Sequence, residues 1–223
     1  MMVRIPEPEL MDDEAQARAY AEADFDAPHN MFVDLMAARI GELSGNALDL
    51  GCGPGDIVRR VAQRFGEVRI EGVEGAGAMV ARACRMVSDY DLDERVRIRH
   101  LYLPSDALAT QGYDIIFSNS LLHHLNDPMV LWASVLRCAK PGARVFVMDL
   151  LRPPNRMTAQ ALVDEYAAAE PEVLRNDFFN SLLAAYQLDE VRHQLAQAGL
   201  GSLHTEQVSD RHWISHGEIC AGS

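Results

Sequence analysis

The stretch that decides the fold is Asn46-Ala47-Leu48-Asp49-Leu50-Gly51-Cys52-Gly53-Pro54-Gly55-Asp56. Small and apolar residues lead into an acid, three glycines follow, and a helical pattern begins, so we predict a strand, a tight turn and a helix. Because glycine has no Cβ, Gly51 and Gly53 let the backbone approach a bound molecule closely. The helix expected from Asp56 to Phe65 points its first free N–H groups at this turn, which favours a carboxylate or phosphate.

The run from Asp49 to Gly55 resembles the first motif of class I S-adenosylmethionine (SAM)-dependent methyltransferases. In the dinucleotide fingerprint the third glycine follows the second by three residues. Here Gly55 follows Gly53 by two, and an acid precedes the first glycine, so the spacing favours SAM over NAD. Three alternatives remain open: a SAM-binding protein with other chemistry, an NAD-dependent oxidoreductase and, less favoured, an RNA methyltransferase.

A second strand, Val68–Glu74, ends on an acid about 20 residues after the glycine turn, the separation at which a carboxylate accepts hydrogen bonds from ribose hydroxyls. We therefore predict that Glu74 binds the ribose. The next residues, from Gly75 to Val87, predict a helix. The resemblance places Met79 of this helix against the adenine.

The third strand, Val96–Leu101, is where the chain departs from the family pattern. Many related enzymes have Gly-Asp directly after this strand, with the acid on the adenine amino group, but this chain has Leu101-Tyr102 there. We expect backbone groups near Tyr102 and Leu103, with stacking by the Tyr102 ring, to take over adenine recognition.

The richest stretch runs from Tyr113 to Pro128 and reads as a buried strand followed by polar residues. It resembles the fourth motif of small-molecule methyltransferases, including those of ubiquinone and menaquinone biosynthesis, which ends in a His-His pair. The resemblance implies that Asn119 and Ser120 lie beside the methionine part of SAM. It also makes His123 and His124 the candidate catalytic residues, because a neutral imidazole accepts a proton near pH 7.

The resemblance further implies an α/β, Rossmann-like, doubly wound seven-stranded sheet of order 3-2-1-4-5-7-6, with the last strand antiparallel. We divide the chain into N-terminal lid helices (1–44), a SAM-binding core (45–150), a helical cap insertion (151–187) and a C-terminal helix with a β-hairpin (188–223). The lid offers Tyr20 and Phe25 as candidate ligand contacts. The cap offers Arg152, Tyr166, Phe178 and Tyr186.

Composition sets the remaining limits. The 223 residues carry a formal net charge of −13, which repels nucleic acid, so a small-molecule substrate is expected. Four scattered cysteines without CxxC spacing indicate reduced thiols, and we predict no metal site. We find no signal sequence or apolar span, and expect a cytoplasmic monomer or homodimer without membrane insertion.

The sequence therefore predicts a SAM-dependent methyltransferase that transfers a methyl group to a small metabolite by in-line displacement and releases S-adenosylhomocysteine. The sequence does not indicate which atom accepts the methyl group. The predicted cofactor-binding residues are Tyr20, Asp49, Gly51, Cys52, Gly53, Glu74, Gly75, Met79, Tyr102, Leu103, Asn119 and Ser120.

Overall fold

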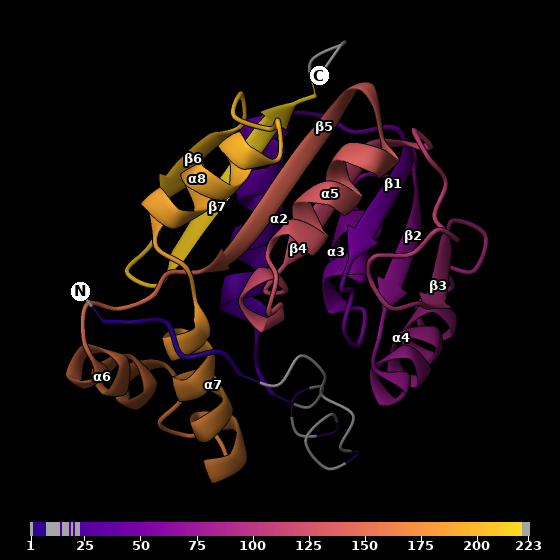
Figure 1. Ribbon diagram of the computed structural model, residues 1–223. Coiled ribbons are helices and arrows are strands. Elements are labelled where there is room, and N and C mark those ends of the chain that lie inside the picture. The colour runs from indigo at the N-terminus through magenta and orange to yellow at the C-terminus, as the bar shows by residue number, and fades with distance from the viewer. Residues whose placement is uncertain (1, 8–13, 15–17, 19, 21–22, 220–223) are drawn as a thin grey trace.

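A seven-stranded sheet of order β3-β2-β1-β4-β5-β7-β6 forms the centre of the molecule (Figure 1). The computed structural model describes residues 2–7, 14, 18, 20 and 23–219. β7 is antiparallel to both of its neighbours, whereas β1 to β5 pair in parallel, so the predicted order and the antiparallel last strand are confirmed. The strands are β1 (Gly45–Leu50), β2 (Val68–Glu74), β3 (Val96–His100), β4 (Tyr113–Asn119), β5 (Ala139–Leu150), β6 (His204–Gln207) and β7 (His212–Glu218).

Helices cover both faces because the central strands are apolar on both sides. Alternate residues such as Ala47 and Leu48 enter two different cores. α2, α3 and α4 pack in the first core, and α5 and α8 in the second. The helices are α2 (Asp26–Ile40), α3 (Asp56–Arg64), α4 (Gly77–Asp89), the 3-10 turn η1 (Leu122–His124), α5 (Met129–Cys138), α6 (Arg156–Tyr166), α7 (Glu172–Ala184) and α8 (Leu188–Gln197).

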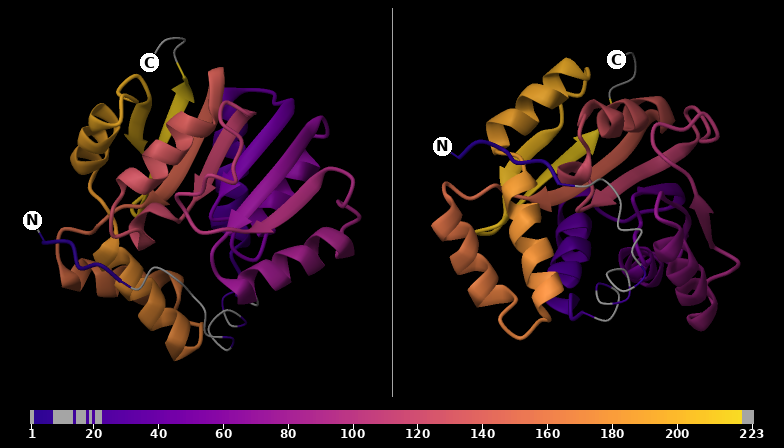
Figure 2. Two further views of the ribbon diagram at one scale, coloured as in Figure 1. Left: turned by 45° about the vertical axis from the view of Figure 1, so that its right-hand side comes forward. Right: turned by 60° about the horizontal axis from the view of Figure 1, so that its bottom comes forward.

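Two helices lie away from the sheet faces. Figures 1 and 2 show α6 and α7 beyond the carboxyl ends of the central strands. The N-terminal residues run beside them, where the N–H of Ile5 donates to the carbonyl of Leu183 at 3.0 Å. This edge, where ligands bind in doubly wound folds, is therefore covered by the described N-terminal residues and by α6 and α7. Among the helices in the described residues, none is long and apolar enough to cross a membrane.

Several predicted boundaries need correction. The apolar run from Arg144 to Leu150 predicts the fifth strand, but β5 begins earlier, at Ala139, which pairs with Tyr113 before the register shifts. Asp127-Pro128 predicts a helix start capped by the acid, and α5 begins at Met129, whose N–H is accepted by the Asp127 carboxylate at 2.9 Å. The sequence predicts closing strands at about 201–208 and 211–215, and they run over His204–Gln207 and His212–Glu218. A composition rich in Ala, Glu, Asp and Arg predicts a helix from Glu9 to Ala23, most of which lies outside the described residues.

Candidate active site

The glycine turn is fastened to β2 through its backbone. The N–H groups of Gly51 and Cys52 both donate to the carbonyl of Val73, each at 2.9 Å. Gly51 has φ +75°, and a Cβ there would lie 2.8 Å from Leu121 Cδ1. Gly53 also has positive φ, but a Cβ there would meet nothing within 4 Å. Gly51 is thus required by packing, whereas Gly53 faces open space that a ligand can enter.

Glu74 completes this turn from the end of β2. Its Oε2 accepts the N–H of Gly53 at 3.0 Å, and its Oε1 accepts the N–H of Ala76 at 2.8 Å. Each carboxylate oxygen keeps further acceptor capacity, because an ionised carboxylate offers about four lone-pair sites. The carboxylate is therefore oriented by backbone donors and still able to accept hydroxyl groups.

Beside the turn, Asp49 and Asn119 have buried oxygen atoms without a hydrogen-bond partner among the described residues. Asp49 is 1% exposed, in β1 between Gly72 of β2 and Phe117 of β4. In the described part of the chain, neither carboxylate oxygen of Asp49 has a hydrogen-bond partner, and the same is true of Asn119 Oδ1. Burial, reinforced by the charge of Glu74, raises the pKa of Asp49 well above its usual range. A ligand that brings N–H donors and positive charge would satisfy these acceptors.

A chamber of about 260 Å³ opens next to these residues, at the carboxyl edge of the sheet. Asn119 and Ser120 form its floor at the end of β4, with His123 and His124 of η1. Ser120 has φ +55°, an uncommon conformation for a residue with a side chain, and its N–H donates to Met148 at 2.9 Å. The other walls are Tyr20, Phe25 and His29 from the N-terminal part, Tyr166, Glu170, Leu174, Asp177, Phe178 and Ser181 from the α6–α7 part, and Arg211 and His212 from β7 and the turn before it.

The two histidines are held by acids from distant parts of the chain. Asp149 Oδ1, at the end of β5, lies 2.5 Å from His123 Nδ1, and both side chains are buried. Glu7 Oε1 lies 3.5 Å from His123 Nε2 and 3.2 Å from His124 Nδ1. Burial opposes charge on His123, but the Asp149 carboxylate outweighs it and raises the pKa of His123. The same pairing lowers the pKa of Asp149 despite its burial.

The predicted residues fall into two groups, one at the glycine turn and one along the chamber. The backbones of Gly51, Cys52 and Gly53 lie beside Glu74 and Gly75, while Asn119, Ser120, His123, His124 and Tyr20 line the chamber. Tyr20 also packs against Met79, which links the two groups. The Cys52 side chain belongs to the core below the turn, so only its backbone faces the turn. Tyr102 is 56% exposed beside His100, and Leu103 packs at the edge of the second core.

Two cap candidates require correction. Arg152 and Tyr186 are not among the described residues that line the chamber. Arg152 is buried and donates to the Ala185 carbonyl and the Glu190 carboxylate, which joins the end of β5 to α8. Tyr186 lies under the guanidinium of Arg4, 4.3 Å from the ring centroid. Both therefore have packing partners, because the chain turns back onto the sheet after α7.

The sequence prediction missed Glu7, Asp149 and His212. The sequence could have indicated Asp149 as a site residue, because it is an acid near the end of an apolar strand, as Asp49 and Glu74 are. Glu7 had none, because its contacts are with residues more than one hundred positions away. His212 lines the chamber, and burial lowers its pKa to about 4, so it is neutral near pH 7.

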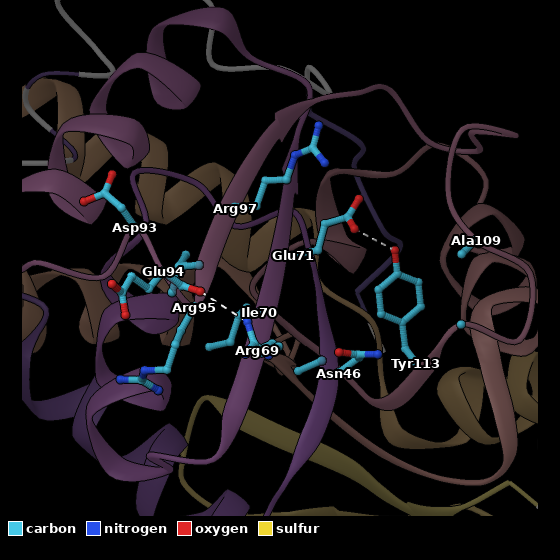
Figure 3. A pocket seen from close by; sticks show the side chains of 13 residues that line it. Asn46, Arg69, Ile70, Glu71, Asp93, Glu94, Arg95, Arg97, Ala109 and Tyr113 are labelled. Carbon is cyan, nitrogen blue, oxygen red and sulfur yellow. Dashed lines mark hydrogen bonds between the residues drawn. The ribbon is translucent and has the colours of Figure 1, made fainter.

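A larger cavity, of about 390 Å³, lies at the opposite edge, near the amino ends of β1 and β2 (Figure 3). Its walls carry charges of both signs, and the Tyr113 hydroxyl points at Glu71, to which it donates at 3.0 Å. Ligands of doubly wound sheets bind at the carboxyl edge. We therefore place the candidate active site in the smaller chamber and not in this cavity.

Comparison with known proteins finds methyltransferases. A methyltransferase domain model matches residues 48–145, from β1 into β5. The 27-O-demethylrifamycin SV methyltransferase of Amycolatopsis mediterranei is 26% identical over 73% of this chain and 56% of its own length. The ubiquinone biosynthesis O-methyltransferase of Acinetobacter baumannii is 24% identical over 79% of this chain and 75% of its own. This chain thus aligns with just over half of the first relative and three quarters of the second.

The fold has solved counterparts. A SAM-dependent methyltransferase from Aquifex aeolicus superposes with a TM-score of 0.68 at 18% identity, over 93% of this chain and 98% of that one. The unpartnered acceptors at Asp49 and Asn119 fit the ammonium group of SAM, and the open face of Gly53 fits its close approach. The matched domain, the strand order and these relatives together make the chain similar to class I SAM-dependent methyltransferases.

Proposed function

We propose that this chain methylates a hydroxyl group of a small molecule that occupies the 260 Å³ chamber. The observation that carries the proposal is the position of the chamber, which shares Asn119 and Tyr20 with the predicted cofactor site. When bound, SAM supplies a methyl group already activated by its sulfonium. The names of both curated relatives describe oxygen methylation, which supports a hydroxyl acceptor.

The predicted cofactor residues have separate tasks in this proposal. Glu74 accepts the ribose hydroxyls, and Asp49 with Asn119 holds the ammonium group. Met79 and Tyr102, with backbone groups near Leu103, border the adenine. Gly51 and Gly53 shape the turn so that its backbone approaches the cofactor. The positions of Glu74 beside Gly53 and of Met79 beside Tyr20 support these assignments.

The chamber residues then have to orient the acceptor and keep water out. Alignment of two reacting groups alone supplies about 7–11 kcal/mol of a barrier. We assign His123 and His124 to contact with the acceptor hydroxyl and to its loss of a proton. Asp149 fixes the imidazole ring of His123 through the hydrogen bond at Nδ1, and Nε2 faces the carboxylate of Glu7.

We also propose the division into lid, core, cap and C-terminal hairpin made from the sequence. Chamber walls from Tyr20 and Phe25 support a lid role for residues 1–44, and walls from Tyr166 and Phe178 support a cap role for residues 151–187. A cytoplasmic location, a monomer or homodimer, and the absence of a nucleic-acid partner stay predictions.

The test is transfer from methyl-labelled SAM to a panel of small hydroxylated compounds, with products identified by their mass. Replacement of His123 or His124 by Ala should lower kcat by about 10²–10⁴-fold while S-adenosylhomocysteine binds as before. Near-normal turnover in both variants would make the histidines structural and remove them from the proposal.

A further inference from the structure

Glu7 joins His123 and His124, two residues that line the chamber, so that three potential metal ligands come together. One carboxylate oxygen and one nitrogen from each imidazole all lie within 4.8 Å of one another. The two measured separations, from Glu7 Oε1 to His123 Nε2 and to His124 Nδ1, are 3.5 and 3.2 Å. Zinc bonds to such ligands of about 2.0–2.2 Å place neighbouring ligand atoms about 3–3.5 Å apart. The spacing therefore suits one shared cation.

The hydrogen bonds around His123 leave a lone pair that needs a positive partner. Asp149 is an acceptor when ionised, so His123 donates its Nδ1 hydrogen to it. In the neutral ring, Nε2 is then also an acceptor, and it faces the carboxylate of Glu7. Either a proton on Nε2 or a cation between Nε2 and the carboxylate satisfies this pair. One divalent cation would also balance the two carboxylates of Glu7 and Asp149.

The pairing of Asp149 with His123 is the support that metal-bound histidines usually have. A ligating imidazole commonly donates its other N–H to a carboxylate, which fixes its orientation. Asp149 is itself fixed, because its Oδ2 accepts the N–H of Leu122 at 2.7 Å and its Oδ1 that of Leu150 at 2.6 Å. The geometry of His123 is thus set before any ligand binds.

Hydrogen bonds also fix the position of Glu7 and of the residues before it. The Arg4 guanidinium donates to the carbonyls of Ala184, His123 and Leu125 at 2.6, 2.9 and 3.1 Å. Ser181 donates its hydroxyl to Glu7 Oε1 at 3.0 Å. Arg4 adds a positive charge nearby, but its N–H groups are directed at backbone carbonyls. The N-terminal segment therefore delivers an oriented carboxylate to the two histidines.

We propose that Glu7, His123 and His124 bind one divalent cation of the zinc class, with its remaining coordination positions directed into the chamber. Two histidines and one glutamate are a known ligand set of catalytic zinc, which keeps an open position. A hydroxyl oxygen bound there would lose its proton more readily. This use of the metal rests on the proposed function, whereas the binding of the metal does not.

A second cluster provides the control. His204, Glu206 and His216 also bring their ligand atoms within 4.8 Å, on β6 and β7. Here Arg39 Nε already donates to Glu206 Oε1 at 2.7 Å, so the carboxylate has a cationic partner. We expect no zinc at this second cluster, and His204→Ala is the matched control for His124→Ala.

The experiment is calorimetric titration of Zn²⁺ into the full, untagged, chelator-treated chain, with bound metal counted by elemental mass spectrometry. Neither SAM nor acceptor is present, so the result does not depend on methyl transfer. We expect one zinc per chain, and affinity at least tenfold lower in Glu7→Gln and His124→Ala. Asp149→Asn should lose about 10–100-fold, and His204→Ala should match the wild type.

Glu7→Gln keeps the size of the side chain and one acceptor oxygen. Circular dichroism with S-adenosylhomocysteine binding verifies that each variant is folded. Zinc affinity that is unchanged in folded Glu7→Gln overturns the proposal. So does a wild-type chain that binds no zinc, in which case protons satisfy the facing acceptors. Zinc binding that His204→Ala abolishes would place the metal at the second cluster and overturn it as well.

Discussion

The carboxylate of Asp149 holds the imidazole of His123, with 2.5 Å between Oδ1 and Nδ1 and both side chains buried. His123 lies in η1, which follows β4, and Asp149 lies near the end of β5, the strand that pairs with β4. The parallel pairing of β4 and β5 therefore brings the acid to the histidine at the chamber wall.

Replacement of Asp149 by Asn should lower kcat by about 10–100-fold, because the supporting carboxylate of a working histidine has effects of this size. Binding of S-adenosylhomocysteine should stay near the wild-type value, since Asp149 is not one of the proposed cofactor contacts. Steady-state kinetics and calorimetry measure the two quantities. Asp114→Asn is the control, because Asp114 pairs with Lys140 at the other end of β4. Equal loss in both variants would argue against a specific role for Asp149.

Asp49→Asn should stabilise the ligand-free protein near pH 7 and weaken S-adenosylhomocysteine binding at least tenfold. The folded state raises the pKa of Asp49, so its contribution to stability is present below about pH 4, the unfolded pKa of Asp, and is lost as pH rises toward the folded pKa. Asn does not ionise and avoids that loss.

Thermal unfolding across pH checks the sign of this effect. The increase in the stability of the ligand-free protein caused by Asp49→Asn should be present at pH 7 and vanish near pH 3.5. Wild-type affinity for S-adenosylhomocysteine should rise with pH, because the ligand ammonium favours the ionised carboxylate. A variant that is less stable than the wild type at pH 7 and equally good at binding would contradict the account of Asp49.

Gly51→Ala should destabilise the chain by about 1–2 kcal/mol, the cost of a left-handed conformation for a residue with a Cβ. The new Cβ would also lie 2.8 Å from Leu121 Cδ1 and disturb the turn, so cofactor binding should weaken. Gly66→Ala is the control, because a Cβ there meets nothing within 4 Å and no positive φ is required. Chemical denaturation and calorimetry compare the two variants, and matching results would show that the turn tolerates a side chain.

Phe178→Ala and Tyr166→Ala should raise KM for the acceptor several-fold and leave the affinity for S-adenosylhomocysteine unchanged. Both rings line the chamber from the α6–α7 side, away from the glycine turn. Met157→Ala, at a position 82% exposed on α6, should have no effect. If the ring variants weaken cofactor binding as much as acceptor binding, residues 151–187 do not act as a substrate cap.

The strands and the glycine turn could be predicted from local patterns, whereas the strand order was predicted from the family resemblance. Apolar runs such as those around Ile116 and Val147 mark buried parallel strands, and the glycines with Glu74 mark the turn at a fixed spacing. The beginning of β5 was not predictable, because Pro141-Gly142 reads as a turn while Ala139 pairs with Tyr113.

The acids around the histidines depend on the tertiary fold instead. Asp149 lies in an apolar run that by itself shows only a strand, and its partner becomes visible once β4 and β5 are paired. Glu7 reaches the histidines through the anchors at Arg4 and Ile5, which bind backbone carbonyls that no sequence pattern indicates. The chamber walls likewise combine segments whose proximity is set by the path of the chain.

Calorimetric titration of S-adenosylhomocysteine and of NAD into the wild type and Glu74→Ala tests whether the turn from Asp49 to Gly53, together with Glu74, binds SAM. We expect one S-adenosylhomocysteine per chain and no measurable NAD binding. Glu74→Ala should bind S-adenosylhomocysteine at least tenfold more weakly, because charge-assisted hydrogen bonds worth about 1.5–3 kcal/mol are lost. Tighter binding of NAD than of S-adenosylhomocysteine would contradict SAM binding by this turn.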